Sequence, residues 1–332
     1  MSWLTAPRAC VRTRALTALA LLVPLAACAP AADSAKPQAT AAGFPYTVTN
    51  CGVKTTFTAP PERAVTMNQH VTEVLLELGL KDRIAGTAYL DDAVLPEYAK
   101  DYESRPVLAD EYPSYEKLLS VNPDFVYGGY ASAFAGNEGR SRGALAKSGI
   151  GTRLNIEGCA KSAVTMDDLY REVREVGRTF GVRERADDWV SGAERELAAT
   201  AKELKGAKPL SVFVYDSGDK TAFTAGGQGI GNEIITRAGG RNVFADLDKS
   251  FGDASWENVV ERAPEVIVIY DYGAQTVAQK KKRLLEDPAL ADVPAIKNER
   301  FAVLPLSDAV LGVRAPAAVE KLAAQLHPDV AR

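Results

Sequence analysis

Aromatic and polar side chains at the ends of predicted strands are the residues of this chain best suited to bind a ligand. The set comprises Asn68, Gln69, His70, Tyr89, Tyr112, Tyr130, Tyr215, Trp256, Tyr272 and Arg314. Tyrosine and tryptophan each offer a flat apolar face together with a polar atom. Ligands of parallel α/β sheets bind beyond the carboxyl ends of the strands, so these residues predict one large pocket lined by aromatic rings. For each residue taken alone, packing in the core or on the surface is the alternative.

Two members of this set have a more specific chemistry. Arg314 precedes the last predicted helix, and its planar guanidinium is suited to hold an anionic ligand group through two parallel hydrogen bonds. A surface ion pair is the alternative for Arg314. His70 lies near the start of the first predicted helix of the fold. It would either donate to a ligand oxygen or cap the turn.

The sequence lacks the motifs of the common enzyme classes. His70 and His327 are the only histidines, which is too few for a zinc site with three histidine ligands. The sequence contains no HExxH motif, no paired CxxC motif, no Walker motif and no nucleophile elbow of the GxSxG type. The glycines of residues 226–231 have the wrong spacing for a dinucleotide-binding loop. We therefore expect no catalysis, no cofactor and no metal site. An exported α/β enzyme, for which Asp91 and Asp92 are the only hint, is the alternative.

The elements that must position the ligand-binding residues form two similar halves. Strand, loop and helix alternate in residues 46–182 and again from residue 206 to residue 332, which predicts two parallel α/β lobes. The segment Tyr115–Asp124 has a counterpart in Trp256–Glu265, with a helix, a proline and a strand in the same order. Thr72–Gly79 has a similar counterpart in the second half. The repeat predicts two related lobes with facing half-sites.

One long helix is predicted between the two halves, in residues 183–205. Its apolar residues recur every three or four positions and therefore lie on one side of the helix. A helix of about 22 residues spans roughly 33 Å, so this segment is predicted to join the two lobes as a strut. The apolar positions are Ala186, Trp189, Val190, Ala193, Leu197, Ala201 and Leu204.

Residues 1–27 have the pattern of a lipoprotein signal peptide. Several arginines precede the apolar run Ala15–Ala27, which is too short to span a bilayer. The run ends in Leu25–Cys28, a lipobox-like sequence in which Cys28 would carry a lipid anchor. Residues 28–45 are rich in alanine, proline, serine and threonine and predict a flexible tether. An ordinary signal peptide with an incidental cysteine is the alternative.

The remaining composition limits the partners. The net charge is −4, which argues against binding to nucleic acid. No later segment has eighteen consecutive apolar residues, so no transmembrane helix is predicted. Cys51 and Cys159 are the only cysteines beyond the tether. Because disulfides persist in exported proteins, we predict that these two cysteines form one. Two buried free thiols are the alternative.

These features together resemble the substrate-binding lipoproteins of ABC importers for iron–siderophores and cobalamin. The resemblance extends over residues 47–326 and is carried by residues 61–75, 79–86, 118–124 and 232–244. It implies the class III periplasmic-binding-protein fold, in which two Rossmann-like α/β lobes are joined by a single long helix. Members that bind a bare metal ion use a cluster of histidines and carboxylates, which this chain lacks.

The resemblance also implies a function. A monomer at the extracytoplasmic face of the cell membrane would capture a ferric siderophore between its lobes and deliver it to the permease and ATPase subunits of an importer. A corrinoid, haem or a deazaflavin-coenzyme precursor is the alternative ligand. Glu73 and Glu233 match acidic residues that dock on arginines of the permease. We expect both to be exposed, since two carboxylates on related helices would orient the complex. Solvated helix residues are the alternative.

Overall fold

The computed structural model describes residues 41–330. The predicted signal peptide, the lipidated Cys28 and most of the tether lie outside the described residues.

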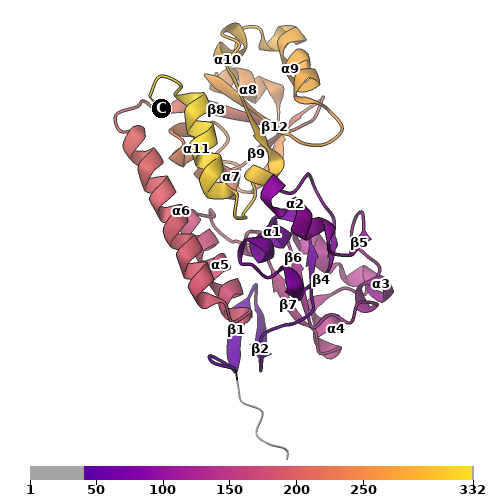
Figure 1. The fold of residues 1–332 in the computed structure, drawn as a ribbon. Helices are drawn as coiled ribbons and strands as arrows, with labels where there is room; N and C mark the ends of the chain where they lie inside the picture. The colour runs from indigo at the N-terminus through magenta and orange to yellow at the C-terminus, as the bar shows by residue number, and fades with distance from the viewer. Residues whose placement is uncertain (1–40, 331–332) are drawn as a thin grey trace, which may run out of the picture. The chain divides into compact units, whose positions relative to one another are not determined.

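The first lobe is built on a five-stranded parallel sheet with the strand order β5-β4-β3-β6-β7. Helices α1 to α5 alternate with these strands along the chain (Figure 1). The chain reverses direction across the sheet between β3 and β6, as in Rossmann-like folds. The strands are β3 (Ala64–Met67), β4 (Ile84–Ala88), β5 (Val107–Ala109), β6 (Phe125–Gly128) and β7 (Gly151–Leu154). The helices are α1 (Gln69–Glu77), α2 (Pro96–Glu103), α3 (Tyr115–Leu119), α4 (Arg142–Lys147) and α5 (Met166–Thr179).

The second lobe has a four-stranded parallel sheet with the order β10-β8-β12-β13. Here the reversal lies between β8 and β12. The two sheets confirm the predicted pair of parallel α/β lobes. The strands are β8 (Leu210–Tyr215), β10 (Gly240–Asn242), β12 (Val266–Asp271) and β13 (Phe301–Pro305). The helices are α7 (Ile230–Arg237), α8 (Trp256–Arg262), α9 (Val277–Glu286), α10 (Pro294–Lys297) and α11 (Ala315–Leu326).

Several short elements complete the fold. An antiparallel hairpin, β1 (Tyr46–Asn50) and β2 (Val53–Phe57), precedes the first sheet. A strand is predicted over residues 51–58, which covers β2, whereas its partner β1 was not predicted. A second antiparallel pair, β9 (Ala222–Ala225) and β11 (Phe251–Ala254), lies in the second half of the chain. Single 3₁₀ turns fill several connections: η1 (Lys81–Arg83), η2 (Ala131–Phe134), η3 (Gly136–Glu138), η4 (Ile156–Cys159), η5 (Pro288–Leu290) and η6 (Leu306–Asp308).

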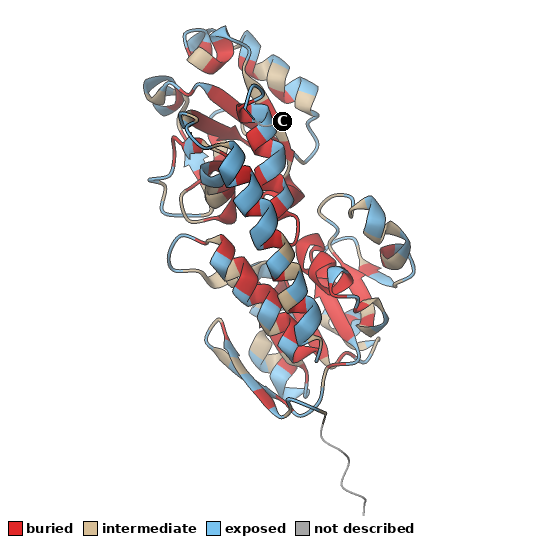
Figure 2. Ribbon diagram, turned by 60° about the vertical axis from the view of Figure 1, so that its left-hand side comes forward, coloured by how far each residue is buried: buried red, intermediate tan, exposed pale blue. Residues whose placement is uncertain are grey.

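The predicted strut is helix α6 (Arg183–Glu203). It packs against α5 of the first lobe and α11 of the second. Its buried residues are Ala186, Val190, Ala193, Leu197 and Thr200, and Figure 2 shows exposed residues along its outer side. The predicted apolar face is therefore correct at its centre. Ala201 is exposed and Trp189 is only half-buried, because the helix lies on the surface at these positions.

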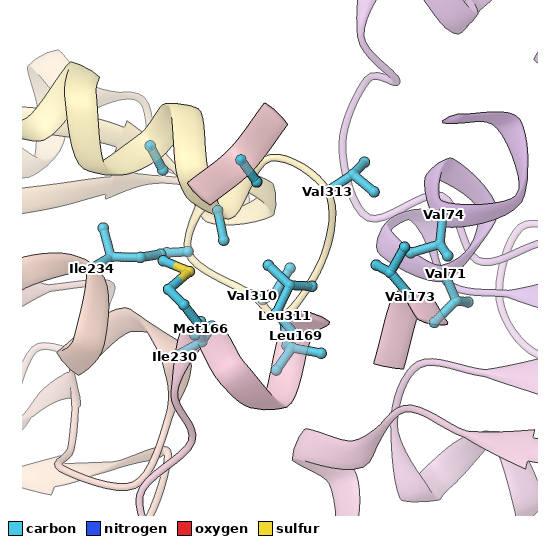
Figure 3. Close-up of a cluster of buried hydrophobic side chains, with 14 of the residues drawn as sticks. Val71, Val74, Met166, Leu169, Val173, Ile230, Ile234, Val310, Leu311 and Val313 are labelled. Atoms are coloured by element: carbon cyan, nitrogen blue, oxygen red, sulfur yellow. The ribbon is translucent and has the colours of Figure 1, made fainter. Parts of the chain in front are cut away.

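One hydrophobic cluster extends through both lobes beside the strut. Figure 3 shows Val71 and Val74 of α1 and Val173 of α5 in the same cluster as Ile230 and Ile234 of α7. The loop before α11 contributes further apolar side chains to it, namely Val310, Leu311 and Val313. The lobes thus share a continuous apolar core and are more than two bodies tethered by a helix.

Candidate ligand-binding site

Each lobe offers a ligand position where its strand order reverses. Ligands of open α/β sheets bind outside the carboxyl ends of the two strands that flank such a reversal. In the first lobe, β3 leads into Asn68 and β6 leads into Gly129 and Tyr130. In the second lobe, β8 leads into Asp216 and β12 leads into Tyr272. The topology alone therefore selects a small part of the predicted set of ligand-binding residues.

Three tyrosines of the first lobe gather at its reversal. The rings of Tyr89 and Tyr112 lie 4.7 Å apart between centroids, and the Tyr112 hydroxyl lies 3.0 Å from Asn68 Oδ1, to which it donates. Tyr130 stands edge-on to the His70 ring at 5.1 Å. The three tyrosines are half-buried, so part of each residue remains accessible. Asn68 and Tyr89 have left-handed φ angles of 90° and 55°, a costly conformation that is common at ligand sites.

His70 forms part of the wall of this site. Its side chain is buried, and burial lowers the pKa of His70 to about 4. The imidazole is therefore neutral at pH 7. Only glycine fits at position 129, because a side-chain Cβ there would lie 2.3 Å from His70 Cε1. The buried His70 ring is in edge-on contact with Tyr130 and is therefore placed to orient the Tyr130 side chain.

Asn68 and Gln69 are also buried and hold the loop after β4. The Gln69 side chain accepts from the Asp92 backbone N–H at 2.8 Å and donates to the Ala93 carbonyl at 3.0 Å. Asp91 Oδ2 lies 3.4 Å from the Gln69 backbone nitrogen. Asn68 and Gln69 thus position Asp91, a residue that sequence reasoning set aside as a solvated loop residue.

Tyr272, which follows β12, contributes an aromatic ring from the second lobe. Its ring packs against the hydrophobic cluster that both lobes share. Burial raises the pKa of Tyr272, and the negative charge of Asp91 in the first lobe raises it further. Burial also raises the pKa of Tyr130, with a smaller contribution from Asp91. We call Tyr89, Asp91, Tyr112, Tyr130 and Tyr272 the tyrosine cluster.

A cavity of about 350 Å³ adjoins Tyr272 on the second lobe. It lies at the carboxyl ends of β8 and β12 and is lined among others by Asp216, Phe223, Gln275 and Lys280. Asp216 and Lys280 are functional candidates that sequence reasoning missed. The available signals were the position of Asp216 directly after a strand and a lysine on the buried face of α9, in register with Val277 and Leu284.

The prediction for Tyr215 is wrong. Tyr215 is the last residue of β8, is fully buried, and donates from its hydroxyl to the Gly218 carbonyl at 2.9 Å. Central strands of parallel sheets are buried on both faces, so an aromatic residue inside such a strand enters the core.

Trp256 is the first residue of α8 and is half-buried. It packs on Tyr215 and on Phe213, and its indole N–H donates to the Asp219 carbonyl. Its role as a ligand-binding residue stays a prediction.

The predicted exposure of Glu73 and the predicted ligand role of Arg314 are also wrong, for one shared reason. The two side chains form a buried ion pair between the lobes, with Arg314 Nε 2.7 Å from Glu73 Oε2 and Arg314 Nη2 2.5 Å from Glu73 Oε1. Glu73 is only 1% exposed. Arg314 also donates to Ser307 Oγ and to the Ala93 carbonyl. Neither group is available to a ligand or to a docking partner.

A second carboxylate, which is half-buried, joins the lobes nearby. Glu157, in η4, accepts from the backbone N–H of Ile230 at 3.0 Å and of Leu311 at 2.9 Å. Burial raises the pKa of Glu157, and these two N–H groups oppose that shift. Cys159 of the same turn is joined to Cys51 by a disulfide with an S–S distance of 2.00 Å. The disulfide therefore ties the turn that carries Glu157 to the β1–β2 hairpin.

Glu233 has a different environment from Glu73. It lies in the first turn of α7, is half-buried, and pairs with Arg237 one turn later, with 2.6 Å between Oε1 and Nε. The two glutamates that the repeat predicts to be equivalent therefore differ in their accessibility.

Two negative findings hold for residues 41–330. Within this part, no helix is long and apolar enough to cross a membrane. The same residues contain no group of three or more histidine, cysteine, aspartate or glutamate side chains placed to hold a metal ion.

Two α/β lobes with facing reversal points, a shared core and one connecting helix define a two-lobed solute-binding protein. A family model described as periplasmic binding protein matches residues 65–307, and the chain belongs to this family. It is similar to the ABC transporter substrate-binding lipoprotein YvrC of Bacillus subtilis, with 26% identity over 92% of this chain and 94% of the relative. The protein is accordingly a substrate-binding protein of the ABC importer class and not an enzyme.

Two further similarities bear on the fold and on the family. The vitamin B12-binding protein of Vibrio campbellii is 27% identical over 63% of this chain and 70% of its own length. The crystal structure of a periplasmic binding protein from Veillonella parvula is 32% identical, with a TM-score of 0.79 over 85% of this chain and 97% of the other.

Proposed function

We propose that the protein captures a ferric siderophore between its lobes and delivers it to the permease and ATPase of an ABC importer. The observation that carries this proposal is the tyrosine cluster, in which half-buried rings from both lobes surround one place. Such rings offer flat apolar faces for a bulky chelate and hydroxyl groups for its polar edge. The proposal divides the chain into lobes at 46–182 and 206–332, joined by residues 183–205.

The proposal also includes the location of the protein. Residues 1–27 would be removed, and a lipid on Cys28 would hold the protein at the extracytoplasmic face of the cell membrane through the tether of residues 28–45. The description of the Bacillus subtilis relative as a lipoprotein supports this location. A lipid-anchored monomer would remain close to its permease.

Titration with ferric siderophores tests the ligand. Ferric complexes absorb light and are expected to quench the fluorescence of tryptophan on binding, with saturation at one ligand per protein. Tyr272→Ala should weaken binding about ten-fold or more, because truncating a central aromatic contact often costs 1–3 kcal/mol. Tyr115→Ala is the matched control, since Tyr115 lies on α3 and contacts Ser148. If no hydroxamate, catecholate or carboxylate siderophore binds, the ligand class is wrong.

A corrinoid is the second candidate, and the similarity to the vitamin B12-binding protein of Vibrio campbellii favours it. A corrinoid is also bulky and largely apolar on its faces, so the same tyrosine cluster would serve. The same titration with cyanocobalamin separates the two candidates. Mass spectrometry of the ligand that the natively purified protein carries would identify either one directly.

Glu116 and Glu257 replace Glu73 and Glu233 in our proposal for the permease contact. Docking through carboxylates needs exposed groups at equivalent positions of the two lobes, and Glu73 fails this requirement. Glu116 and Glu257 are both exposed. Each lies in the first turn of its helix, after a serine N-cap, Ser114 in α3 and Ser255 in α8. The signal was present in the sequence, because this segment is the clearest part of the repeat.

The double variant Glu116→Ala with Glu257→Ala tests the docking proposal. We expect ligand binding by the purified protein to be unchanged and uptake by cells to fall at least ten-fold, because both orienting charges are lost. Glu233→Ala, which removes a half-buried helix carboxylate of the second lobe, is the control and should transport normally. Normal uptake by the double variant would refute the assignment.

A further inference from the structure

We infer that this pocket selects its ligand by charge: it takes a neutral or positively charged ligand and rejects a close analogue with added negative charge. The inference rests on the proposed binding site, but it does not depend on whether the ligand contains iron. Two observations carry it. Two carboxylates lie at the site, and the nearby cationic groups already have other partners.

Asp216 is the first of these carboxylates. It is 5% exposed and lines the cavity of about 350 Å³ beside Tyr272. Within residues 41–330, no group donates a hydrogen bond to its carboxylate, and the nearest cation, Lys280 Nζ, is 3.9 Å away. The oxygens of Asp216 are not fully enclosed, so they open onto this cavity. A donor or a positive charge on the ligand would fill their free acceptor capacity.

Lys280 does not convert this cavity into an anion site. Its ammonium group is buried and donates to the carbonyls of Tyr270 at 2.7 Å and Tyr272 at 2.9 Å. Two of its three protons are thus directed at backbone oxygens, and the third lies on the side of Asp216. It is the only basic residue among those that line this cavity, against Asp216 and Asp219.

Asp91 is the second carboxylate, and it faces the site from the first lobe. Its contacts to the Gln69 backbone nitrogen and to Asn68 Nδ2 are long, at 3.4 and 3.5 Å. Burial raises the pKa of Asp91, and these contacts oppose the shift only in part. Asn68 also accepts from the Tyr112 hydroxyl at 3.0 Å, so Asp91 lies beside the tyrosines of the first lobe, whereas Asp216 lines the cavity beside Tyr272. Each lobe therefore contributes one carboxylate to the proposed site.

The other basic groups of the region have partners already. The Arg140 guanidinium stacks on the Tyr112 ring, with 5.5 Å from Cζ to the ring centroid, but its protons go to the Pro113 carbonyl and to Glu138. Arg314 is paired with Glu73, and His70 is neutral. An anionic ligand would thus meet two carboxylates with only phenol hydroxyl groups to solvate its charge.

A charge series on one scaffold tests the inference. Ferric desferrioxamine B is a trihydroxamate complex with a free amine and one positive charge; its N-acetyl derivative is neutral and its N-succinyl derivative is anionic. We expect affinity to fall about ten-fold for each added negative charge, as expected for charges a few ångströms apart near a protein surface. A parallel iron-free pair, riboflavin and its phosphate ester, covers the case in which the ligand is not an iron complex.

The ratio of affinities within each pair is the readout, because it does not depend on the fraction of folded protein. Asp91→Asn and Asp216→Asn should each reduce this ratio by about three-fold per unit of ligand charge, because the two carboxylates together produce the ten-fold effect. The control Asp188→Asn removes an exposed carboxylate of the strut helix and should leave the ratio unchanged.

The possible results separate the iron function from the charge rule. Preference for the cationic chelate supports both the iron function and the charge rule. Failure of all iron chelates together with preference for riboflavin over its phosphate rejects the iron function and supports the charge rule. Equal or tighter binding of the anionic member of a pair, an unchanged ratio in both carboxylate variants, or no binding of any neutral or cationic probe overturns the charge rule.

Discussion

Glu73→Ala is expected to lower the free energy of unfolding by about 3–5 kcal/mol, the usual cost of removing one partner of a buried ion pair. The loss arises because the Arg314 guanidinium, buried between the lobes, would lose its bidentate partner and keep only one carboxylate contact, the longer one to Asp308, at 3.5 Å. In a protein of this size, the thermal midpoint should fall by roughly 6–15 °C. Differential scanning calorimetry of the purified protein measures both quantities.

Two comparisons make this prediction specific. Glu233→Ala removes a more accessible carboxylate paired with Arg237 and should cost no more than about 1 kcal/mol. The double variant Glu73→Leu with Arg314→Met removes both charges and should recover much of the loss, since apolar pairs often replace buried ion pairs at little cost. A Glu73→Ala variant as stable as Glu233→Ala would contradict the buried pair. Loss of uptake in Glu73→Ala would then need a different explanation from instability.

Cys51→Ser with Cys159→Ser is the second large effect. The disulfide closes a loop with a sequence separation of 108 residues, for which the chain-entropy model gives about 4–5 kcal/mol. Urea unfolding should therefore show an earlier midpoint for the double variant. A reducing agent should shift the wild-type protein to the same midpoint and leave the variant unchanged. Equal stability of all forms, with two thiols reactive in the native wild-type protein, would rule out the bond.

Most of the regular structure could be predicted because it depends on local patterns. Leu210–Tyr215, Trp256–Arg262 and Ala315–Leu326 have the predicted bounds in the structure, since a proline or glycine near each segment and its apolar period define it. The β9 and β11 strands are only four residues long and pair only with each other. Such short strands lack a readable period, and their pairing depends on contacts distant in sequence.

The site was less predictable because burial depends on the tertiary fold. Tyr215 ends β8, whereas Tyr272 lies one residue beyond the end of β12. This small difference places the first ring in the core and the second at the tyrosine cluster, although both look like aromatic residues at strand ends. The pairing of Glu73 with Arg314 was invisible in the sequence, because 241 residues separate them and each alone resembles a solvated charge.

The separation between Glu73 and Arg314 also has a consequence for biogenesis. A chain emerges from the ribosome N-terminus first, and domains generally fold in that order. The first lobe therefore emerges with Glu73 and Glu157 before their partners on the loop ahead of α11 exist. Glu73 gains its contact to Arg314, and Glu157 its contact to Leu311, only when the last tenth of the chain arrives. Truncation of α11 and its preceding loop should consequently expose the first lobe to proteases, although that lobe contains every strand of its own sheet.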